Sequence, residues 1–182
     1  MRKSIKISIV VATFNRPNDT LELVESIHES FKYLKSKIDK KLKIELIIAD
    51  NSTNGGTKKL FLKNRLEYLK YLRVKPLGVS FVRDYAISKA RYSYILITDS
   101  DCIVKKDWLF SFCKEIIKNN FPDVIQGAYF YPYKKNWISL SESKWDKIRF
   151  YTQKQVDTRN FLIKKSAYSK IGGFDKKHFY ST

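Results

Sequence analysis

Two aspartates, Asp99 and Asp101, stand one residue apart at the end of the apolar run 94–98. An apolar run rich in isoleucine and leucine is typical of a β-strand that is covered on both faces. Open α/β sheets bind ligands outside the carboxyl ends of their strands, where these carboxylates would lie. Paired hard oxygen ligands suit Mg²⁺ or Mn²⁺. The pattern predicts a divalent-metal site for a phosphate-bearing substrate. The alternative is a pair of aspartates that only cap the next turn.

Polar groups also end two other expected strands. Asp50 follows the apolar segment 43–49, and the segment 5–13 runs into three polar residues, namely Thr13, Asn15 and Arg16. The carboxyl ends of parallel strands meet at one edge of a sheet. We therefore expect polar groups from three separate strands to converge on one crevice.

The order of elements sets the fold class. Strands are expected at 5–13, 43–49, 68–75, 94–98 and 123–130, and helices at 19–38, 58–64, 80–90 and 108–118. Asp19 with Glu22 is expected to form a capping box, and Ser80 to cap the third helix. Alternating strands and helices predict an α/β fold with a mostly parallel, doubly wound sheet. No glycine-rich dinucleotide loop and no Walker lysine loop follows the first strand.

Composition limits the partners. The chain has 182 residues and a formal net charge of +18, which comes mainly from lysines scattered through the sequence. Such charge indicates a solvated surface first, contact with an anionic membrane second and nucleic-acid binding third. Interleaved aromatics would permit nucleic-acid binding, but no recognition motif for it is present, so we expect no nucleic-acid partner.

The two cysteines, Cys102 and Cys113, do not make a disulfide framework, and both are expected to pack in the protein. No signal peptide is recognised, and no segment reaches the roughly 18 apolar residues that span a bilayer. Free thiols point to a reducing compartment. We therefore expect a cytoplasmic protein, with peripheral contact to the cytoplasmic face of a membrane as a further expectation.

Four segments carry a resemblance to a known family, in the family's order. They are residues 7–17 (ISIVVATFNRP), 47–52 (IIADNS), 78–101 (with GVSFVRD and ILITDSD) and 160–175 (with NFLIKK and IGGFD). On these segments the chain resembles the family 2 glycosyltransferases. The resemblance implies a GT-A fold, a Rossmann-like mostly parallel sheet flanked by helices with a small antiparallel acceptor-side portion. It also implies an inverting enzyme that uses nucleotide sugars.

The resemblance implies roles for named residues. Asp50 would accept a hydrogen bond from the base, often uracil in this family, and Asp99 would contact the ribose hydroxyls. Asp101 would bind the Mn²⁺ or Mg²⁺ that bridges the diphosphate, as in the family's DXD motif. Arg83 would face the nucleotide or its diphosphate, and Asn160 would lie beside the donor sugar. The nucleotide pocket would be lined by Thr13, Asn15 and Arg16.

Three of these residues also have simpler interpretations. Asp50 could end its strand as a turn former. Arg83 could be a surface helix residue, and Asn160 could only satisfy a strand edge.

The sequence departs from the family's pattern twice. The family usually has Arg-Asn where this chain has Arg83-Asp84. The family's general base belongs to an acidic pair about ten residues after the Gly-Gly-Phe-Asp segment, where this chain reaches Thr182. We identify no base. The expectations are a truncated piece, a base supplied from elsewhere, or an inactive donor-binding homologue.

We expect one GT-A domain over 1–182, with a nucleotide-binding half at 1–104 and an acceptor-side half at 105–182. The reaction expected is transfer from a UDP-sugar to a saccharide or lipid-linked acceptor, as in polysaccharide biosynthesis.

In the segment 129–151, aromatics interleave with lysines, and Trp137 and Trp145 are among them. The segment is expected to form a lid, to stack on acceptor sugars or to rest on anionic lipid. A nucleotidyltransferase is a rival enzyme class.

Overall fold

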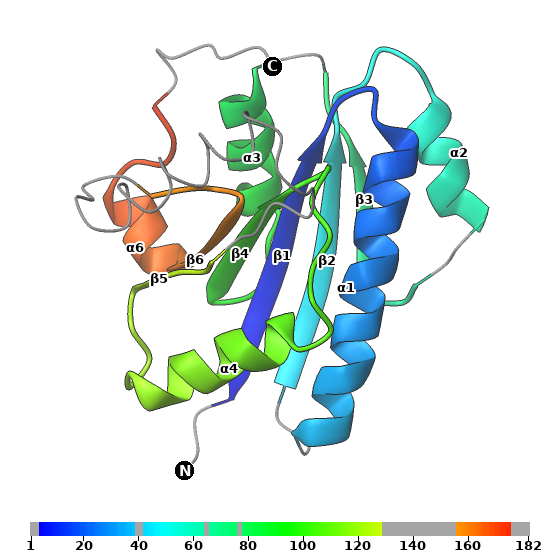
Figure 1. The fold of residues 1–182 in the computed structure, drawn as a ribbon. Helices are drawn as coiled ribbons and strands as arrows, with labels where there is room; N and C mark the ends of the chain where they lie inside the picture. Colours follow the sequence, from blue (N-terminus) through cyan, green and yellow to red (C-terminus); the bar gives the residue numbers. More distant parts are fainter. Residues whose placement is uncertain (1–3, 39–41, 64–65, 76–77, 129–155, 176–182) are drawn as a thin grey trace, which may run out of the picture.

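The computed structural model describes residues 4–38, 42–63, 66–75, 78–128 and 156–175. Within them the strands form one six-stranded sheet in the order β3-β2-β1-β4-β6-β5. The strands are β1 (Ile5–Thr13), β2 (Leu42–Asp50), β3 (Leu69–Arg73), β4 (Tyr94–Asp99), β5 (Val124–Gln126) and β6 (Asn160–Lys164). β1 to β4 are parallel, whereas β6 runs antiparallel to both β4 and β5. The expected α/β fold, mostly parallel with a small antiparallel part, is confirmed (Figure 1).

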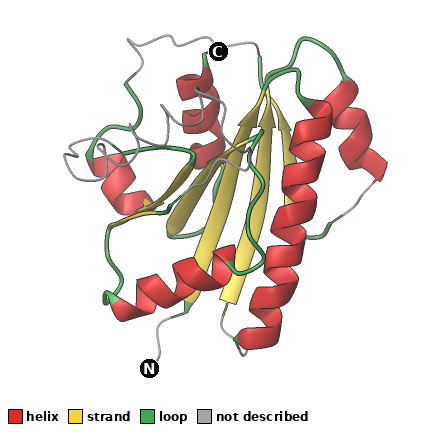
Figure 2. Cartoon of the chain, viewed as in Figure 1, coloured by secondary structure: helices red, strands yellow, loops and turns green. Residues whose placement is uncertain are grey.

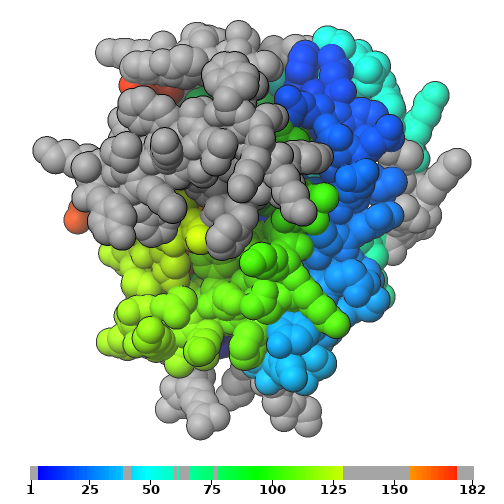
Figure 3. Space-filling model, viewed as in Figure 1, coloured from blue at the N-terminus to red at the C-terminus, as the bar shows by residue number. Residues whose placement is uncertain are grey.

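Helices cover both faces of this sheet (Figure 2). They are α1 (Pro17–Lys37), α2 (Gly56–Lys63), α3 (Val79–Ser88), α4 (Trp108–Lys118) and α6 (Lys165–Lys170). One buried cluster contains residues of α1, α2 and α4, and a second contains residues of α3 and α6. Figure 3 shows the side chains of α1 and α4 forming adjoining parts of the surface over one face. None of the helices in the described ranges combines the length and apolarity that crossing a membrane requires.

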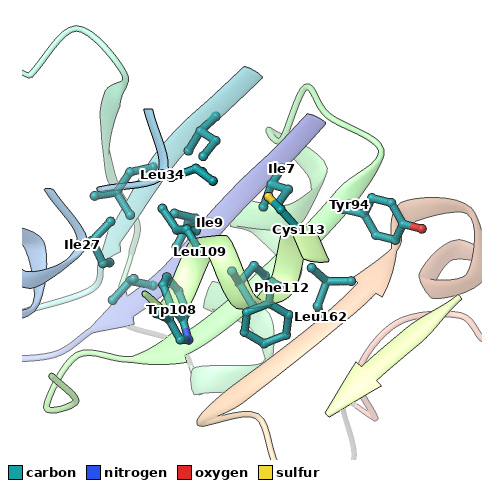
Figure 4. Packing of buried hydrophobic residues seen from close by; sticks show 14 of the residues in the cluster. Ile7, Ile9, Ile27, Leu34, Tyr94, Trp108, Leu109, Phe112, Cys113 and Leu162 are labelled. Carbon is teal, nitrogen blue, oxygen red and sulfur yellow. The ribbon is translucent and has the colours of Figure 1, made fainter. Parts of the chain in front are cut away.

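The pattern of β1 explains why the sheet is covered twice. Ile7 and Ile9 belong to the cluster under α1 and α4, whereas Val10 belongs to the cluster under α3. Figure 4 shows Ile7 and Ile9 among Leu109 and Cys113 of α4. Successive side chains of a strand point to opposite faces, so a continuous apolar run buries both.

Two expected helix caps are wrong. α1 begins at Pro17 with Arg16 at the N-cap and no side-chain cap, so Asp19 lies inside the first turn. Proline suits the first helical position because its φ is preset and it lacks the N–H that would be unpaired there. Gly78 rather than Ser80 is the N-cap of α3, also without a side-chain bond.

The second half of the chain adds the antiparallel strands. β6 pairs with β4 so that Thr98 lies opposite Asn160, and β5 then forms the edge of the described sheet. β5 (Val124–Gln126) is shorter than the predicted 123–130: residues 123, 127 and 128 are described but are not strand, and residues 129–130 lie outside the described residues. The division into halves at residue 104 stays a prediction. The lysine- and aromatic-rich segment 129–151 also lies outside the described residues.

Candidate functional site

The ends of three parallel strands meet at one edge of the sheet. In the register of the sheet Thr13 lies opposite Asp50, and Ala12 lies opposite Asp99. The loops after β1, β2 and β4 therefore start side by side, as expected from the sequence. We call this edge the rim, and the charged residues predicted to lie on it are Arg16, Asp50, Arg83, Asp99 and Asp101.

One ion pair crosses the rim between two loops. Arg16, at the start of α1, donates through Nη1 to Asp101 Oδ2 in the loop after β4. The two side chains are 46% and 50% exposed, so solvent reaches both partners. Exposed ion pairs contribute little to stability and exchange readily. Asp101, the predicted metal ligand, is therefore accessible to solvent, and it is paired with the Arg16 guanidinium.

A second ion pair lies deeper in the same edge. Arg83 Nη2 of α3 is 2.5 Å from Asp99 Oδ1 at the end of β4. The Arg83 side chain is 13% exposed, and its Nε has no hydrogen-bond partner among the described residues. A buried guanidinium N–H without a partner is costly, and an anion would satisfy it. Arg83 thus faces the rim and is not a surface helix residue.

Asp50 differs from the other rim acids because it is fully buried. Its Oδ1 accepts the Ser52 N–H at 2.8 Å, and its Oδ2 accepts the Tyr71 hydroxyl at 2.5 Å and lies 3.5 Å from Arg73 Nη1. Burial, and then the bond to Asp50, raise the pKa of the Tyr71 hydroxyl, which keeps it a donor. Both carboxylate oxygens already have partners.

Tyr71 and Arg73 are site residues that sequence reasoning missed. Both lie on β3, whose parallel pairing places Arg73 opposite Asp50. Arg73 also donates to the Ser52 carbonyl oxygen. The position of Arg73 at the carboxyl end of a predicted parallel strand was the available signal. Its contact with Asp50 depends on β3 lying next to β2.

Asn15 and Thr13 fasten the first loop. Asn15 has a left-handed φ of 53°, its N–H donates to Ser52 Oγ at 2.7 Å, and its Oδ1 accepts the Thr53 N–H at 3.1 Å. Asparagine tolerates this backbone conformation better than most residues. Thr13 is buried and shares a 2.7 Å hydrogen bond with the Thr20 hydroxyl. Thr13 thus fastens the end of β1 to α1, and Asn15 joins the loop after β1 to the loop after β2.

Asn160 stands at the other side of β4, at the start of β6. Its Oδ1 accepts the Trp108 indole N–H at 2.8 Å, and its Nδ2 donates to the Ala128 carbonyl at 2.7 Å. A Cβ on Gly127 would lie 2.3 Å from Asn160 Nδ2, so only glycine fits there. Both ends of the amide are therefore engaged in fastening β6 to α4 and to the chain after β5.

The carboxylates of the rim are few for a metal site made of protein ligands alone. Among the described residues no group of three or more histidine, cysteine, aspartate or glutamate side chains could enclose a metal. Mg²⁺ and Mn²⁺ are commonly held by one or two carboxylates plus substrate phosphates. The half-exposed Asp101 beside Asp99 fits that donor set. Burial, followed by the nearby Asp99 charge, raises the pKa of the neighbouring Cys102, so this residue stays a thiol.

Comparison with known families decides the assignment. The sequence model of glycosyl transferase family 2 matches residues 8–171. The chain belongs to this family. The match includes every charged residue of the rim and also Asn160. The resemblance expected from the four sequence segments is therefore confirmed.

Curated relatives of the family 2 chain are much longer than it is. Chondroitin synthase from Pasteurella multocida (strain Pm70) is 24% identical over 124 residues, which is 66% of this chain and 12% of the relative. An uncharacterized glycosyltransferase from Rickettsia bellii (strain RML369-C) is 25% identical over 123 residues, 65% of this chain and 16% of the relative. The chain therefore spans a small part of each.

Solved structures share the fold. TarS 1-349 from S. aureus has a TM-score of 0.67 at 19% identity, covering 97% of this chain and 52% of that protein. The mannosyltransferase PcManGT from Pyrobaculum calidifontis, solved with GDP-Man and Mn²⁺, has a TM-score of 0.72 at 16% identity. The match covers 96% of this chain and 49% of the mannosyltransferase. The chain spans about half the length of these proteins and has the same GT-A architecture.

Proposed function

We propose that this family 2 chain binds a nucleoside-diphosphate sugar at the rim and serves sugar transfer from it with the help of a metal. The observation that carries the proposal is the convergence of two carboxylate–guanidinium pairs on one strand edge, the half-exposed Arg16–Asp101 and the more buried Arg83–Asp99. In a bound diphosphate with its cation, the phosphates would pair with the guanidinium groups and the cation with the carboxylates. Solved proteins of this fold hold UDP-GlcNAc in one case and GDP-Man with Mn²⁺ in another.

In this proposal the two pairs exchange partners when the donor binds. Asp101 would hold Mn²⁺ or Mg²⁺, while Arg16 and Arg83 would turn their charge to the diphosphate. The bound metal would act as a Lewis acid on the leaving diphosphate. Arg83 already lies at the rim beside Asp99. Once it has turned to the diphosphate, its positive charge would stabilise the negative charge that develops on the leaving group.

The remaining rim residues would recognise the nucleoside. We assign Asp99 to the ribose and Asp50 to the base, with UDP as the nucleotide. Asp50 is fully buried and bonded to Tyr71, so a base would bond to it only after displacing that hydroxyl or Arg73. Thr13 would support the pocket by fastening the end of β1 to α1, and Asn15 by joining the loops after β1 and β2.

The proposal also covers the acceptor side. We propose a single displacement with inversion, to a saccharide or lipid-linked acceptor, within one domain over 1–182 whose halves meet near residue 104. Asn160 would lie beside the donor sugar, although both ends of its amide have protein partners. The free thiols favour a cytoplasmic setting. Polysaccharide biosynthesis and contact with anionic lipid stay predictions, and no residue is assigned as the general base.

Calorimetry of the full chain with UDP, GDP and dTDP, each with and without Mn²⁺, tests the donor site. We expect UDP to bind more tightly with Mn²⁺ than without it, and an Asp101→Asn variant to lose that dependence. Asp107→Asn, which removes an exposed carboxylate a short way along the chain, is the matched control. Absence of metal-dependent binding for every nucleotide would refute the proposal.

The products separate the remaining possibilities. Incubation with UDP-sugars and Mn²⁺ should release UDP when an acceptor is present. Release of pyrophosphate from a sugar phosphate and UTP would instead identify a nucleotidyltransferase. Nucleotide binding without any release across a panel of acceptors would identify a donor-binding homologue.

A further inference from the structure

Asp84, the residue after Arg83, belongs to a cluster that joins α3 to α6 and to the turn after α6. Asp84 Oδ1 accepts the Tyr168 hydroxyl from α6 and the Phe174 N–H at 3.2 Å. One carboxylate thus joins α3 to a helix and a turn that lie more than eighty positions later in the sequence. Burial, and then the bond to Asp84, raise the pKa of Tyr168, so its hydroxyl remains protonated as a donor.

The turn that Asp84 binds is shaped for close approach. Gly172 and Gly173 have φ values of +82° and +85°, which residues other than glycine rarely adopt. A Cβ on Gly173 would lie 3.1 Å from Asp84 Oδ1 and 3.3 Å from the Tyr168 hydroxyl oxygen. The glycines therefore let the backbone come against the carboxylate and direct the Phe174 N–H towards it.

Phe174 connects this cluster to the rim. Its ring centroid lies 5.6 Å from that of Tyr168 with the rings at 67°, an edge-on contact. The guanidinium carbon of Arg83 lies 5.8 Å from the Phe174 ring centroid, within cation–π range. Arg83 is bonded to Asp99 at the same time. The guanidinium is therefore held by a carboxylate and by an aromatic ring whose own place depends on Asp84.

We propose that Asp84 is a positioning residue for Arg83: it anchors Phe174, and the Phe174 ring holds the guanidinium where the donor diphosphate would bind. The inference rests on the proposed role of Arg83 in donor binding. Asp84 acts through Phe174 and does not itself contact the donor. The Asp84 carboxylate can hold this turn because it accepts hydrogen bonds from both the Tyr168 hydroxyl and the Phe174 N–H.

A double-mutant cycle tests the coupling. We expect Asp84→Ala to weaken Mn²⁺-dependent UDP binding by about tenfold, a loss typical of one charge-assisted hydrogen bond. Asp84→Ala should cost nothing further in an Arg83→Ala background, because the guanidinium that it positions is already absent. Asp84→Asn should restore most of the affinity, and Tyr168→Phe should lose part of it. Equal losses in both backgrounds, or no loss in the native background, would overturn the proposal.

Asp123→Asn is the matched control, because it removes a carboxylate from an exposed pair with Lys164 at 2.7 Å. It should leave the UDP affinity unchanged. If Asp84→Ala does not fold, Tyr168→Phe carries the test, and a UDP affinity equal to the native value in that variant would contradict the proposal.

A second measurement separates this inference from the donor proposal. In the ligand-free chain, the NMR signal of the Arg83 Nε–H should shift in Asp84→Ala and in Phe174→Leu but not in Asp123→Asn. An unchanged Arg83 Nε–H signal in both variants would refute the positioning role, whatever their UDP affinity. A moved signal together with unchanged UDP binding in Arg83→Ala would leave the positioning intact and refute the role of Arg83 in donor binding.

Discussion

Carboxylates paired with guanidinium groups occur at both ends of the parallel sheet, in different surroundings. Near the amino end, Glu45 of β2 is 1% exposed, and its carboxylate accepts the Ser8 hydroxyl at 2.6 Å, the Arg91 N–H at 2.6 Å and the Arg91 Nε–H at 2.9 Å. At the rim, the Arg16–Asp101 and Arg83–Asp99 pairs are partly exposed. Glu45 has its bonds completed by the fold, whereas the rim pairs can exchange one partner for a ligand.

Asp50 is the exception that shows what decides the difference. It lies on the rim but is as buried as Glu45, and both of its oxygens have protein partners. Burial and completed hydrogen bonds, and not the residue type, separate a carboxylate that stabilises the fold from one that is available to a ligand. Asp50 therefore serves the fold in the ligand-free chain, and the nucleotide role that we propose for it would require displacement of a neighbour.

The largest expected effect is at the rim. Asp101→Asn should lower the rate of sugar transfer by about 10²-fold or more, as for other electrostatic groups that act on a developing charge. The thermal midpoint should hardly change, since the Arg16–Asp101 pair is half exposed. Steady-state kinetics and thermal unfolding measure the two quantities. If Asp101→Asn lost thermal stability together with its rate, Asp101 would resemble Glu45 in stabilising the fold, and the contrast between the two ends of the sheet would disappear.

The Glu45 network should respond in the opposite way. Glu45→Leu leaves the Ser8 hydroxyl and the Arg91 N–H without their acceptor, which should lower the free energy of unfolding by about 1–3 kcal/mol. UDP affinity should stay at the native value. Urea unfolding and calorimetry check these outcomes, with Glu25→Leu on the exposed side of α1 as control. Weakened UDP binding in Glu45→Leu would show that the two ends of the sheet are coupled.

Acid should remove the contribution of Glu45. Burial by itself would raise the pKa of Glu45, but the bonds from Ser8 and Arg91 together hold it below its ordinary value of 4.5. A lowered folded-state pKa means that the stabilisation is complete above the unfolded-state pKa and disappears as the pH falls through the folded-state pKa. The stability gap between the native chain and Glu45→Gln should therefore shrink below about pH 4.5. Urea unfolding at several acidic pH values tests it, and a constant gap would contradict it.

The smallest effect concerns the metal alone. Arg16→Ala should tighten Mn²⁺ binding without nucleotide by a factor of about 2 to 5, because the cation no longer competes with a guanidinium for Asp101. UDP binding with Mn²⁺ should become weaker in the same variant, because one diphosphate partner is lost. Titration followed by the EPR signal of free Mn²⁺ measures the first quantity. Unchanged or weaker metal binding would show that Arg16 does not compete for Asp101.

Strand positions were predictable because the physical signal is local. The apolar runs that became β1 and β4 have few ways to bury both faces other than inside a covered parallel sheet. Helix starts were less predictable, since Pro17 and Gly78 set them through backbone geometry and the expected caps at Asp19 and Ser80 are not used.

The sequence alone determined the α/β fold, the family and the meeting of three strand-end loops at one edge, because apolar periodicity and short motifs act over a few residues. Only the tertiary structure decided which charges are paired. Asp50 meets Tyr71 because β3 lies beside β2, and Asp84 meets Phe174 because α6 packs near α3. Contacts between residues distant in sequence depend on how the elements pack in space, which no local pattern encodes.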